Sequence, residues 1–262
     1  MRHQVVIITG ASSGIGQACA LEYAKKGSIV ILAARNEAKL GELSIAITEL
    51  GARSLIVPID VTIAEDRKRL IDVAIEQFGR IDVLLNNAGI SQRALAKDTI
   101  LDVERQLMEV NYFGVIALTR LALKHMIAAK SGHIGIISSI VGKFGFPLRT
   151  GYSASKHALH GYFESLRAEL YHDNIKIAII CPGRVKTNIS INALTSDGSS
   201  HSKMDDGTEA GISAEYCARQ IIRAIDKGKR ETYIGGKEIL LIYIRRFLPS
   251  IFHKMILNIK PT

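Results

Sequence analysis

The chain has 262 residues, of which 47% are hydrophobic, and it carries a formal net charge of +9. This length and composition predict one large α/β domain with a substantial core rather than two independent small domains. Three widely spaced cysteines without a CxxC pair argue against a disulfide framework and against a cysteine-based zinc site. The N-terminus enters an apolar run too short for a signal peptide, so a cytoplasmic location is expected.

The positive charge is concentrated at the C-terminal end of the chain. Residues 223–262 contain nine Lys or Arg against three Asp or Glu, which is two thirds of the net charge. Such a region can attract nucleic acid, acidic lipid headgroups or a phosphorylated cofactor, or it can be a solvated basic surface. Nucleic-acid binding is not expected, because the region matches no known nucleic-acid-binding module.

Short apolar runs alternate with segments of helical spacing along the chain. The expected strands are residues 4–9, 29–33, 54–58, 81–85, 132–139, 175–181 and 232–234. The expected helices are residues 15–26, 37–50, a charged run ending at 78, helix-like stretches over 99–130, then 152–171 and 215–227. Wholly apolar strands between helices are typical of a parallel sheet covered on both faces. The pattern predicts an α/β fold with a doubly wound, Rossmann-type sheet of about seven parallel strands.

The first expected strand runs into a glycine-rich loop that opens the first expected helix. Gly10, Gly14 and Gly16 follow the spacing G-x-x-x-G-x-G. Glycines allow a tight turn and a close approach of the backbone to a pyrophosphate, whose charge is favoured by the free N–H groups of the helix N-terminus. The loop therefore predicts a dinucleotide site, although glycines in a strand–helix turn also serve packing alone.

The end of the second expected strand discriminates between cofactors. A dinucleotide fold usually places an acid near this position to hold the adenosine ribose hydroxyls, whereas this chain has Ala34 and Arg35 and no acid before Glu37. Ala34 cannot repel a 2′-phosphate, and Arg35 can donate charge-assisted hydrogen bonds to it. NADP(H) is therefore the predicted cofactor. The alternative is that Arg35 is a solvated residue at the start of a helix.

A tyrosine, a lysine and an upstream serine form the predicted catalytic group. Tyr152 and Lys156 are four residues apart on an expected helix, which places both on one face. A nearby ammonium group lowers the pKa of a phenol from about 10, so Tyr152 is predicted to exchange a proton near neutral pH. Ser139 is predicted to end the fifth strand, where its hydroxyl can hold a substrate oxygen. Tyr233 and Lys237 share the spacing but lack a serine partner.

These motifs, in this order, resemble those of the short-chain dehydrogenase/reductase family over about residues 4–236. The resemblance rests on the loop 9–16, Asp60-Val61, Asn86-Asn87-Ala88-Gly89, Asn111, Ser139, Tyr152-x-x-x-Lys156 and Pro182-Gly183. It implies that Tyr152 is the acid–base residue and that Ser139 orients the substrate. It also implies that Lys156 binds the nicotinamide ribose and that Asn111 holds a water molecule of the proton relay.

The same resemblance implies a cofactor site along the carboxyl edge of the sheet. Its implied members are Gly10, Ser12, Ser13, Gly14, Ile15, Gly16, Arg35, Asn36, Asp60, Val61, Asn87, Ala88, Gly89, Tyr152, Lys156, Pro182, Gly183, Val185 and Thr187. Asp60 and Val61 would line the adenine pocket, and Thr187 would lie near the nicotinamide carboxamide. No metal site is predicted.

Some of these positions have structural alternatives. Asp60 can serve as a helix N-terminal cap and Asn111 as a cap at a helix junction, and both roles can coexist with the functional ones. Ser12 and Ser13 stand where many NADP-preferring members of the family carry Lys or Arg. Recognition of the 2′-phosphate would therefore depend more heavily on Arg35.

The implied function is the NADP(H)-dependent interconversion of a carbonyl and a secondary alcohol by hydride transfer from a cofactor that the protein positions. The expected substrate is a lipophilic small molecule such as a steroid, an acyl lipid or a ketone. Residues 141–148 and 188–211 are expected to line its site, and they show no anchoring charge pattern. The alternative is a catalytically silent NADP(H)-binding regulator or scaffold, against which the complete catalytic set argues. A homodimer or homotetramer is expected.

Residues 237–262 are expected to form a basic, amphipathic extension of the catalytic domain, which spans residues 1–236. Polar residues recur there at helical spacing against a broad apolar face and predict one amphipathic helix over about residues 239–259. The positions that recur at this spacing are Arg245, Arg246, Pro249, Ser250, His253, Lys254 and Asn258. The uncharged stretches are too short to span a membrane. The apolar stripe is expected to be buried on lipid as a peripheral membrane contact, on a second subunit or on the substrate cleft, and all three remain open.

Overall fold

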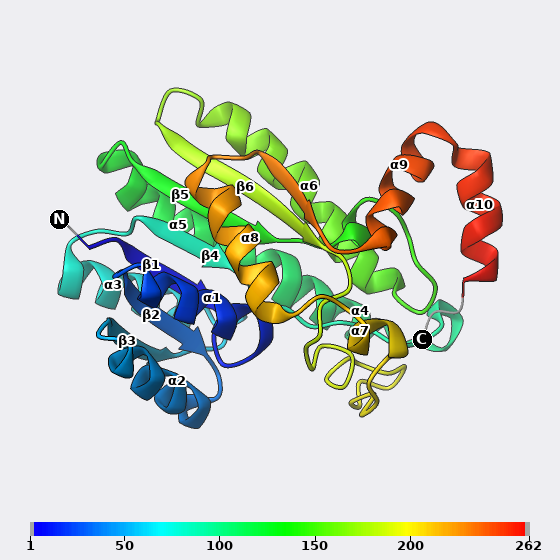
Figure 1. Ribbon diagram of the computed structural model, residues 1–262, viewed down its shortest axis with the longest axis horizontal. Helices are drawn as coiled ribbons and strands as arrows, with labels where there is room; N and C mark the ends of the chain where they lie inside the picture. Colours follow the sequence, from blue (N-terminus) through cyan, green and yellow to red (C-terminus); the bar gives the residue numbers. More distant parts are fainter. Residues whose placement is uncertain (1–2, 260–262) are drawn as a thin grey trace.

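The fold is a parallel sheet, seen in a computed structural model that describes residues 3–259 (Figure 1). Its seven strands lie in the order β3-β2-β1-β4-β5-β6-β7, and each neighbouring pair is parallel. They are β1 (Val5–Thr9), β2 (Ile29–Ala34), β3 (Arg53–Pro58), β4 (Val83–Asn86), β5 (Gly132–Ile137), β6 (Ile175–Pro182) and β7 (Glu231–Ile234). The predicted seven-stranded, doubly wound sheet is confirmed.

Helices cover both faces of the sheet and continue beyond its last strand. The α-helices are α1 (Gly14–Lys25), α2 (Glu37–Glu49), α3 (Ala64–Phe78), α4 (Leu101–Met108), α5 (Gly114–Ala128), α6 (Thr150–Glu169), α7 (Asp206–Glu209), α8 (Ala214–Asp226), α9 (Leu240–Phe247) and α10 (Pro249–Asn258). Short turns of helix are η1 (Ala96–Asp98), the π-helix η2 (Glu109–Phe113), η3 (Ile140–Gly142) and η4 (Lys237–Ile239).

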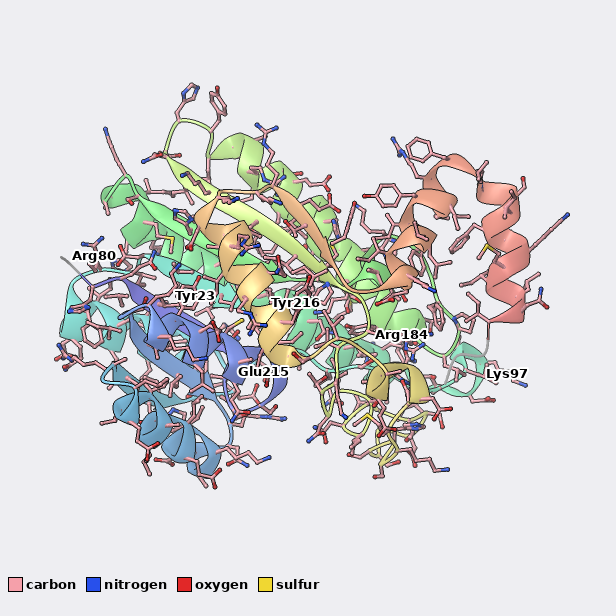
Figure 2. All side chains as sticks on the ribbon, in the orientation of Figure 1. Tyr23, Arg80, Lys97, Arg184, Glu215 and Tyr216 are labelled. Atoms are coloured by element: carbon pink, nitrogen blue, oxygen red, sulfur yellow. The ribbon has the colours of Figure 1, made fainter. Side chains whose placement is uncertain are left out.

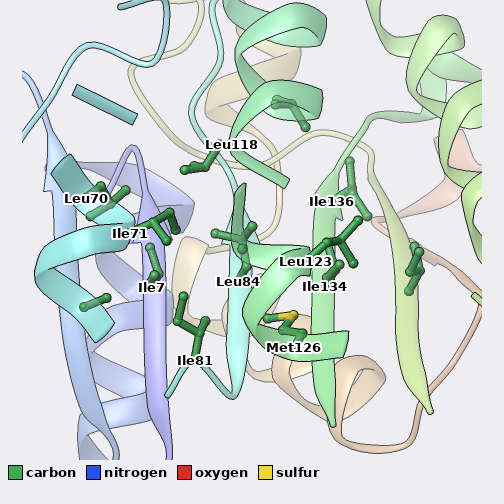
Figure 3. Close-up of a cluster of buried hydrophobic side chains, with 14 of the residues drawn as sticks. Ile7, Leu70, Ile71, Ile81, Leu84, Leu118, Leu123, Met126, Ile134 and Ile136 are labelled. Carbon is green, nitrogen blue, oxygen red and sulfur yellow. The ribbon is translucent and has the colours of Figure 1, made fainter. Parts of the chain in front are cut away.

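The core consists of two apolar layers, one on each face of the sheet. Successive side chains of a strand point to opposite faces, so that Ile7 joins one layer and Ile8 the other. The layer around Ile7 includes Leu70 of α3 and Leu118 of α5, which pack over the central strands (Figure 3). The layer around Ile8 is covered by α1, α2 and α8. Because both faces are covered, the central strands β1, β2 and β4 are buried along their whole length.

The order of the strands places the ligand crevice. The chain moves outward from β1 to β3 on one side and from β4 to β7 on the other, so the direction of winding changes between β1 and β4. Ligands of such sheets bind outside the carboxyl ends of the strands at this switch point. The glycine-rich loop follows β1, and the loops that follow β4, β5 and β6 lie at the same edge.

One expected element boundary was wrong near the site, and one expected helical region is resolved into its parts. The helix-like stretches expected over residues 99–130 are α4 and α5, joined by the π-turn η2. The strand expected to end at Ser139 ends at Ile137. The Ser139 side chain instead accepts a hydrogen bond from the Val141 N–H and begins η3. The serine therefore sits on a turn beyond the sheet edge.

The single C-terminal helix expected over residues 239–259 was also wrong. The chain forms two helices, α9 and α10, which are joined at Leu248. Leu248 has φ −133° and ψ 57°, because Pro249 excludes the helical conformation from the residue before it and has no N–H to donate. The two helices form a hairpin beside the carboxyl edge of the sheet (Figure 1). No helix among residues 3–259 is long and apolar enough to cross a membrane.

Candidate active site

A cavity of about 910 Å³ opens along the carboxyl edge of the sheet, from the glycine-rich loop to the C-terminal hairpin. Most of the predicted site residues line it: Gly10, Ser12, Ser13, Gly14, Ile15, Arg35, Asn36, Asp60, Val61, Asn87, Ala88, Gly89, Ser139, Tyr152, Lys156, Pro182, Gly183, Val185 and Thr187. Gly16 and Asn111 lie behind this lining and contact residues that form it. The fold thus brings residues from the whole chain to one cavity.

The glycine-rich loop forms a cradle at the start of α1. Gly10 and Gly14 have φ values of +64° and +55°, a backbone conformation that other residues rarely adopt. A Cβ on Gly10 would lie 2.9 Å from the Ala88 Cα, and a Cβ on Gly16 would overlap the Gly10 carbonyl oxygen. Ser13 is the N-cap of α1, yet its side chain accepts no hydrogen bond from the first turn. The N–H groups of that turn have no capping side chain, so the cradle fits a dinucleotide pyrophosphate.

Asn87 ties this cradle to the end of β4. Its Nδ2 donates to the carbonyl oxygens of Thr9, at 2.9 Å, and Gly10, at 3.1 Å. The Thr9 hydroxyl accepts hydrogen bonds from the backbone N–H groups of Asn87 and Ala88. These bonds fix the loops after β1 and β4 at the switch point. The role of Asn87 seen here is to shape the cofactor wall from behind.

The adenosine end of the cavity carries two basic side chains. The Arg35 side chain is 75% exposed, and its Nη1 lies 4.0 Å from a carboxylate oxygen of Asp60. Lys39 also lines this end, and sequence reasoning missed it although it follows Arg35 by one helical turn. The Asn36 side chain accepts a hydrogen bond from the Lys39 N–H and caps α2, so Asn36 shapes this wall.

Asp60 does not cap a helix. Its carboxylate accepts hydrogen bonds from the backbone N–H, at 2.8 Å, and the hydroxyl, at 2.7 Å, of Thr62. The N-cap of α3 is Ile63, three residues further on. The alternative interpretation of Asp60 as an N-terminal cap was therefore wrong, and its carboxylate stabilises the turn that carries Val61 into the cavity.

Tyr152 and Lys156 lie one turn apart on α6, buried at the centre of the cavity. The Lys156 Nζ is 5.7 Å from the centre of the Tyr152 ring and donates to the Ile137 carbonyl oxygen at 2.9 Å. Burial lowers the pKa of Lys156 to about 8. The ammonium group is thus close to its titration point at the pH of the cell.

The acidity expected for Tyr152 does not match the structure. Burial raises the pKa of the Tyr152 phenol, and this effect exceeds the lowering caused by the hydrogen bond with Ser139 and by the charges of Arg93 and Arg149. The predicted lowering of the Tyr152 pKa by the nearby ammonium group was therefore wrong. A protonated phenol is the form that donates a proton to a carbonyl oxygen. Tyr152 is therefore held in its acid form.

Asn111 lies on the π-turn η2 behind the lysine. Its Nδ2 donates to the Ile90 carbonyl oxygen, at 2.9 Å, and to the Ser155 hydroxyl, at 3.0 Å. Its Oδ1 accepts from the Ile90 N–H at 2.9 Å. A Cβ on Gly89 would lie 3.0 Å from this oxygen and 3.4 Å from the Lys156 Nζ. Asn111 therefore connects α6 with the loop after β4, and the small residue at 89 leaves room for both side chains.

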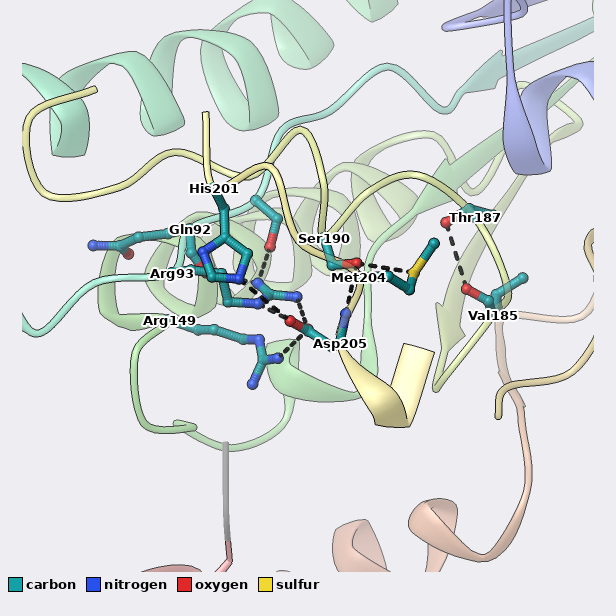
Figure 4. A network of polar contacts seen from close by, with 10 residues as sticks. Gln92, Arg93, Arg149, Val185, Thr187, Ser190, His201, Met204 and Asp205 are labelled. Carbon is teal, nitrogen blue, oxygen red and sulfur yellow. Dashed lines mark hydrogen bonds and ion pairs between the residues drawn. The ribbon is translucent and has the colours of Figure 1, made fainter. Parts of the chain in front are cut away.

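The substrate end of the cavity contains a buried ion network that the sequence did not reveal (Figure 4). Asp205 accepts from the Nε of Arg93 at 2.9 Å, from its Nη2 at 2.5 Å, and from the Nη2 of Arg149 at 3.0 Å. Arg93 follows β4, Arg149 is the N-cap of α6, and Asp205 precedes α7. One carboxylate therefore joins the three loops that enclose this end of the cavity.

The network has clear electrostatic consequences. Burial alone would raise the pKa of Asp205, but the hydrogen bond from Arg93 and the charges of both arginines hold it below its usual range. Burial and the charge of Arg93 lower the pKa of Arg149 to about 10, against the opposing effect of Asp205. Gln92 adds a neutral link, because its Oε1 accepts from the Gly151 N–H at 2.9 Å. The start of α6, which carries Tyr152, is thus fixed from two sides.

A second polar cluster lies behind the catalytic residues. Ligand-type atoms of His160, Cys181 and Glu231 lie within 4.8 Å of one another. The Lys143 Nζ lies 3.0 Å from the Glu231 carboxylate and 3.5 Å from the His160 Nδ1. Burial, followed by the charge of Lys143, lowers the pKa of His160 to about 4. The ammonium group of Lys143 thus already neutralises the Glu231 carboxylate.

The fold and this set of side chains define an oxidoreductase of the dinucleotide-binding type, and comparison with known proteins identifies the family. The sequence profile described as short chain dehydrogenase matches residues 4–197. The chain is 41% identical over 260 residues to "Dehydrogenase/reductase SDR family member 7B" of Mus musculus, covering 97% of this chain and 80% of that protein. The chain belongs to the short-chain dehydrogenase/reductase family.

Two solved structures have the same fold at lower identity. A short-chain dehydrogenase/reductase from Burkholderia phymatum in complex with NAD has a TM-score of 0.86 at 24% identity, covering 99% of this chain and 96% of that chain. An alcohol dehydrogenase from Thermococcus sibiricus complexed with 5-hydroxy-NADP has a TM-score of 0.78 at 24% identity, covering 90% of this chain and 97% of that chain. Structural neighbours of this chain therefore bind either type of nicotinamide cofactor.

Proposed function

We propose that the protein is an NADP(H)-dependent oxidoreductase that interconverts a lipophilic carbonyl compound and the corresponding secondary alcohol. The observation that carries the proposal is the convergence of Ser139, Tyr152 and Lys156 on one cavity whose other end is the glycine cradle. Bound at this cradle, the nicotinamide cofactor supplies the hydride. The Tyr152 phenol, protonated because it is buried, donates the proton to the developing alkoxide.

The chain's own residues divide the remaining work. Ser139 holds the substrate oxygen against Tyr152, and Lys156 binds the ribose hydroxyls of the cofactor with its ammonium group. Asn111 positions α6 against the loop after β4 through its bonds to Ile90 and Ser155. Apolar side chains that line the substrate end, among them Phe144, Leu194 and Leu241, exclude water and favour a lipophilic substrate.

The preference for NADP(H) rests on charge at the adenosine end. Arg35 and Lys39 both line the cavity there. The Asp60 carboxylate, 4.0 Å from the Arg35 Nη1, accepts two hydrogen bonds from Thr62. Two cations with exposed side chains favour a 2′-phosphate over a free hydroxyl. Ser12 and Ser13 add hydroxyl donors but no charge.

The test begins with cofactor binding and proceeds to turnover. Titration of the purified protein with NADPH and NADH is expected to give tighter binding of NADPH. A panel of lipophilic ketones is then expected to include compounds that oxidise NADPH, followed by loss of its absorbance. Tight NADPH binding without turnover of any compound, in either direction, would favour the silent regulator. Absence of binding to both cofactors would overturn the proposal.

The expected homo-oligomer and cytoplasmic location stay proposals. Leu101 and Phe113 are exposed apolar residues around a shallow hollow on α4 and η2. Such a hollow supports self-association through this side of the molecule. Analytical ultracentrifugation of the parent and of Leu101→Gln is the measurement: a dimer or tetramer that the variant dissociates is the expected result. A monomeric parent would contradict it.

A further inference from the structure

The hairpin of α9 and α10 meets the body of the protein with one face only. Ile242 and Phe252 are its buried side chains, and the Phe252 ring packs on Phe144 at a centroid distance of 5.3 Å. The base of the hairpin is held by Glu238, whose carboxylate accepts from the Arg184 N–H at 2.9 Å. Arg184 is labelled in Figure 2. The hairpin is therefore attached firmly at its inner side.

The outer side of the hairpin is unusually apolar. Leu240 and Phe247 are seven residues apart on one face of α9, and Ile251 and Met255 are one turn apart on α10. All four are exposed, and Phe247 is 72% exposed. Exposed apolar residues elsewhere on a protein surface are ordinarily scattered singly.

The tip of the hairpin concentrates this surface. We call the hairpin tip the three residues Phe247, Leu248 and Ile251, which are 72%, 51% and 50% exposed and lie around the break between the two helices. The tip is far from the sheet in Figure 1, at the outer end of both helices. It thus protrudes from the body of the molecule.

The charges around the tip have one sign. Residues 239–259 contain Arg245, Arg246 and Lys254 and no Asp or Glu. All three cations are exposed, and each lies within three residues of a residue of the tip. A surface that only faces water would carry acidic as well as basic side chains around its apolar residues. A layer of anionic lipid headgroups, in contrast, is complementary to basic side chains alone.

We propose that the α9–α10 hairpin docks the protein on the surface of an anionic lipid bilayer, with the hairpin tip inserted at the headgroup level and the three cations on the lipid phosphates. Short amphipathic helices with basic polar faces bind bilayer interfaces in this way without spanning them. The inference is independent of the proposed reaction, because it rests on the outer face of the hairpin and not on the catalytic residues.

The location of the hairpin gives this docking a use. Leu241, near the start of α9, and Ile259, at the end of α10, line the same cavity as Tyr152. The hairpin thus forms part of the wall at the substrate end of the cavity. A protein docked by the hairpin tip would hold the substrate end of its cavity about 15 Å, one length of α10, from the bilayer surface, where a lipophilic carbonyl compound would accumulate.

Vesicle co-sedimentation of the full-length chain tests the proposal. The parent is expected to bind vesicles of phosphatidylcholine with phosphatidylglycerol, to bind phosphatidylcholine alone weakly, and to be released by salt. Phe247→Gln/Ile251→Gln is expected to weaken binding to the anionic vesicles by about a hundredfold or more, because two large apolar side chains lose their burial. Arg246→Gln/Lys254→Gln is expected to weaken it by about fivefold per charge.

Matched controls separate this result from a general loss of apolar surface or of folding. Ile45→Gln/Tyr171→Gln removes side chains that are 64% and 77% exposed on other parts of the molecule, and it is expected to bind as the parent does. The thermal midpoints of all variants are expected to equal that of the parent, because every altered side chain is exposed.

Three outcomes would overturn the proposal. The first is a parent that fails to bind anionic vesicles, and the second is equal loss of binding in the control variant. The third is a change of oligomeric state in Phe247→Gln/Ile251→Gln without any change in vesicle binding, which would assign the hairpin to a subunit interface. Loss of vesicle binding with retained NADPH affinity would support docking whatever the substrate is.

Discussion

The two ends of the cavity are built from different material. Around the glycine cradle of the cofactor end, the wall is main chain: glycines with positive φ, the free N–H groups of α1, and the carbonyl oxygens that Asn87 holds. At the substrate end, the wall is held by charged side chains from three loops and by the C-terminal hairpin. A main-chain wall suits a ligand whose shape is constant, whereas a side-chain wall can vary without disturbing the sheet.

The difference also separates what is local in sequence from what is not. The glycine cradle is complete within a few residues. The ion pairs at the substrate end join Asp205 to Arg149 and Arg93, which are 56 and 112 residues away. Substitutions can therefore be chosen that act on the chemistry, on the substrate end or on the cofactor end separately.

The largest expected effect is on the chemistry, between the two ends. Tyr152→Phe removes the proton donor and is expected to lower kcat by about 10²–10⁴-fold, while the Kd for NADPH stays nearly constant. Tyr233→Phe is the matched control, since Tyr233 lies on β7 and packs on Tyr243, and it is expected to keep the parent rate. The measurement is steady-state kinetics with a ketone that the parent protein reduces. A Tyr152→Phe variant as fast as the parent would contradict the assignment of Tyr152 as the proton donor.

The next effect is confined to the substrate end. Asp205→Asn removes the buried charge that both guanidinium groups share, and it is expected to cost about 3 kcal/mol of the free energy of unfolding. KM for the carbonyl substrate is expected to rise, while the Kd for NADPH stays unchanged. Denaturant titration and both binding measurements test this, with the neighbouring, exposed Asp206→Asn as control. A rise in the Kd for NADPH as large as the rise in KM would show that the two ends of the cavity are coupled.

A smaller effect is expected at the cofactor end alone. Arg35→Ala removes charged hydrogen bonds worth about 1.5–3 kcal/mol and is expected to weaken NADPH by about tenfold to a hundredfold. NADH binding serves as the internal control and is expected to be unchanged. Lys39→Ala is also expected to weaken NADPH binding, but by a smaller factor. Equal dissociation constants for the two cofactors in the parent would refute the preference.

The smallest effect is a gradual dependence on pH. The pKa of Lys156, lowered by burial to about 8, lies below the usual value, so its ammonium group is lost as the pH rises through about 8. kcat/KM for NADPH is expected to fall above this pH, by no more than about tenfold per pH unit. Lys156→Arg keeps the charge and is expected to move this limb upward in a pH–rate profile. If the fall in kcat/KM occurs at the same pH in Lys156→Arg, the titrating group is not Lys156.

Prediction from the sequence succeeded where the signal was local. The alternation of strands and helices fixed the sheet, and the motifs placed most of their residues on one cavity. The break at Pro249 follows from a local residue, but the apolar periodicity continues across it and predicts one helix. The acidity of Tyr152 depends on its depth of burial, which is a property of the packed molecule and not of the sequence around it. The network around Asp205 has no signature in the sequence, since its partners meet only after folding.

The π-turn η2 has a geometric consequence of its own. A π-turn holds one residue more than an α-helical turn, so it rotates the helix that follows by about 100° relative to the one before. Leu107 on α4 thereby faces the apolar cluster around Tyr152, while Leu118 on α5 faces the sheet. Deletion of a single residue from η2 would restore an unbroken helix and turn one of these contacts toward water. Asn111 lies on this turn, so a change in the rotation of α5 relative to α4 would displace Asn111 first.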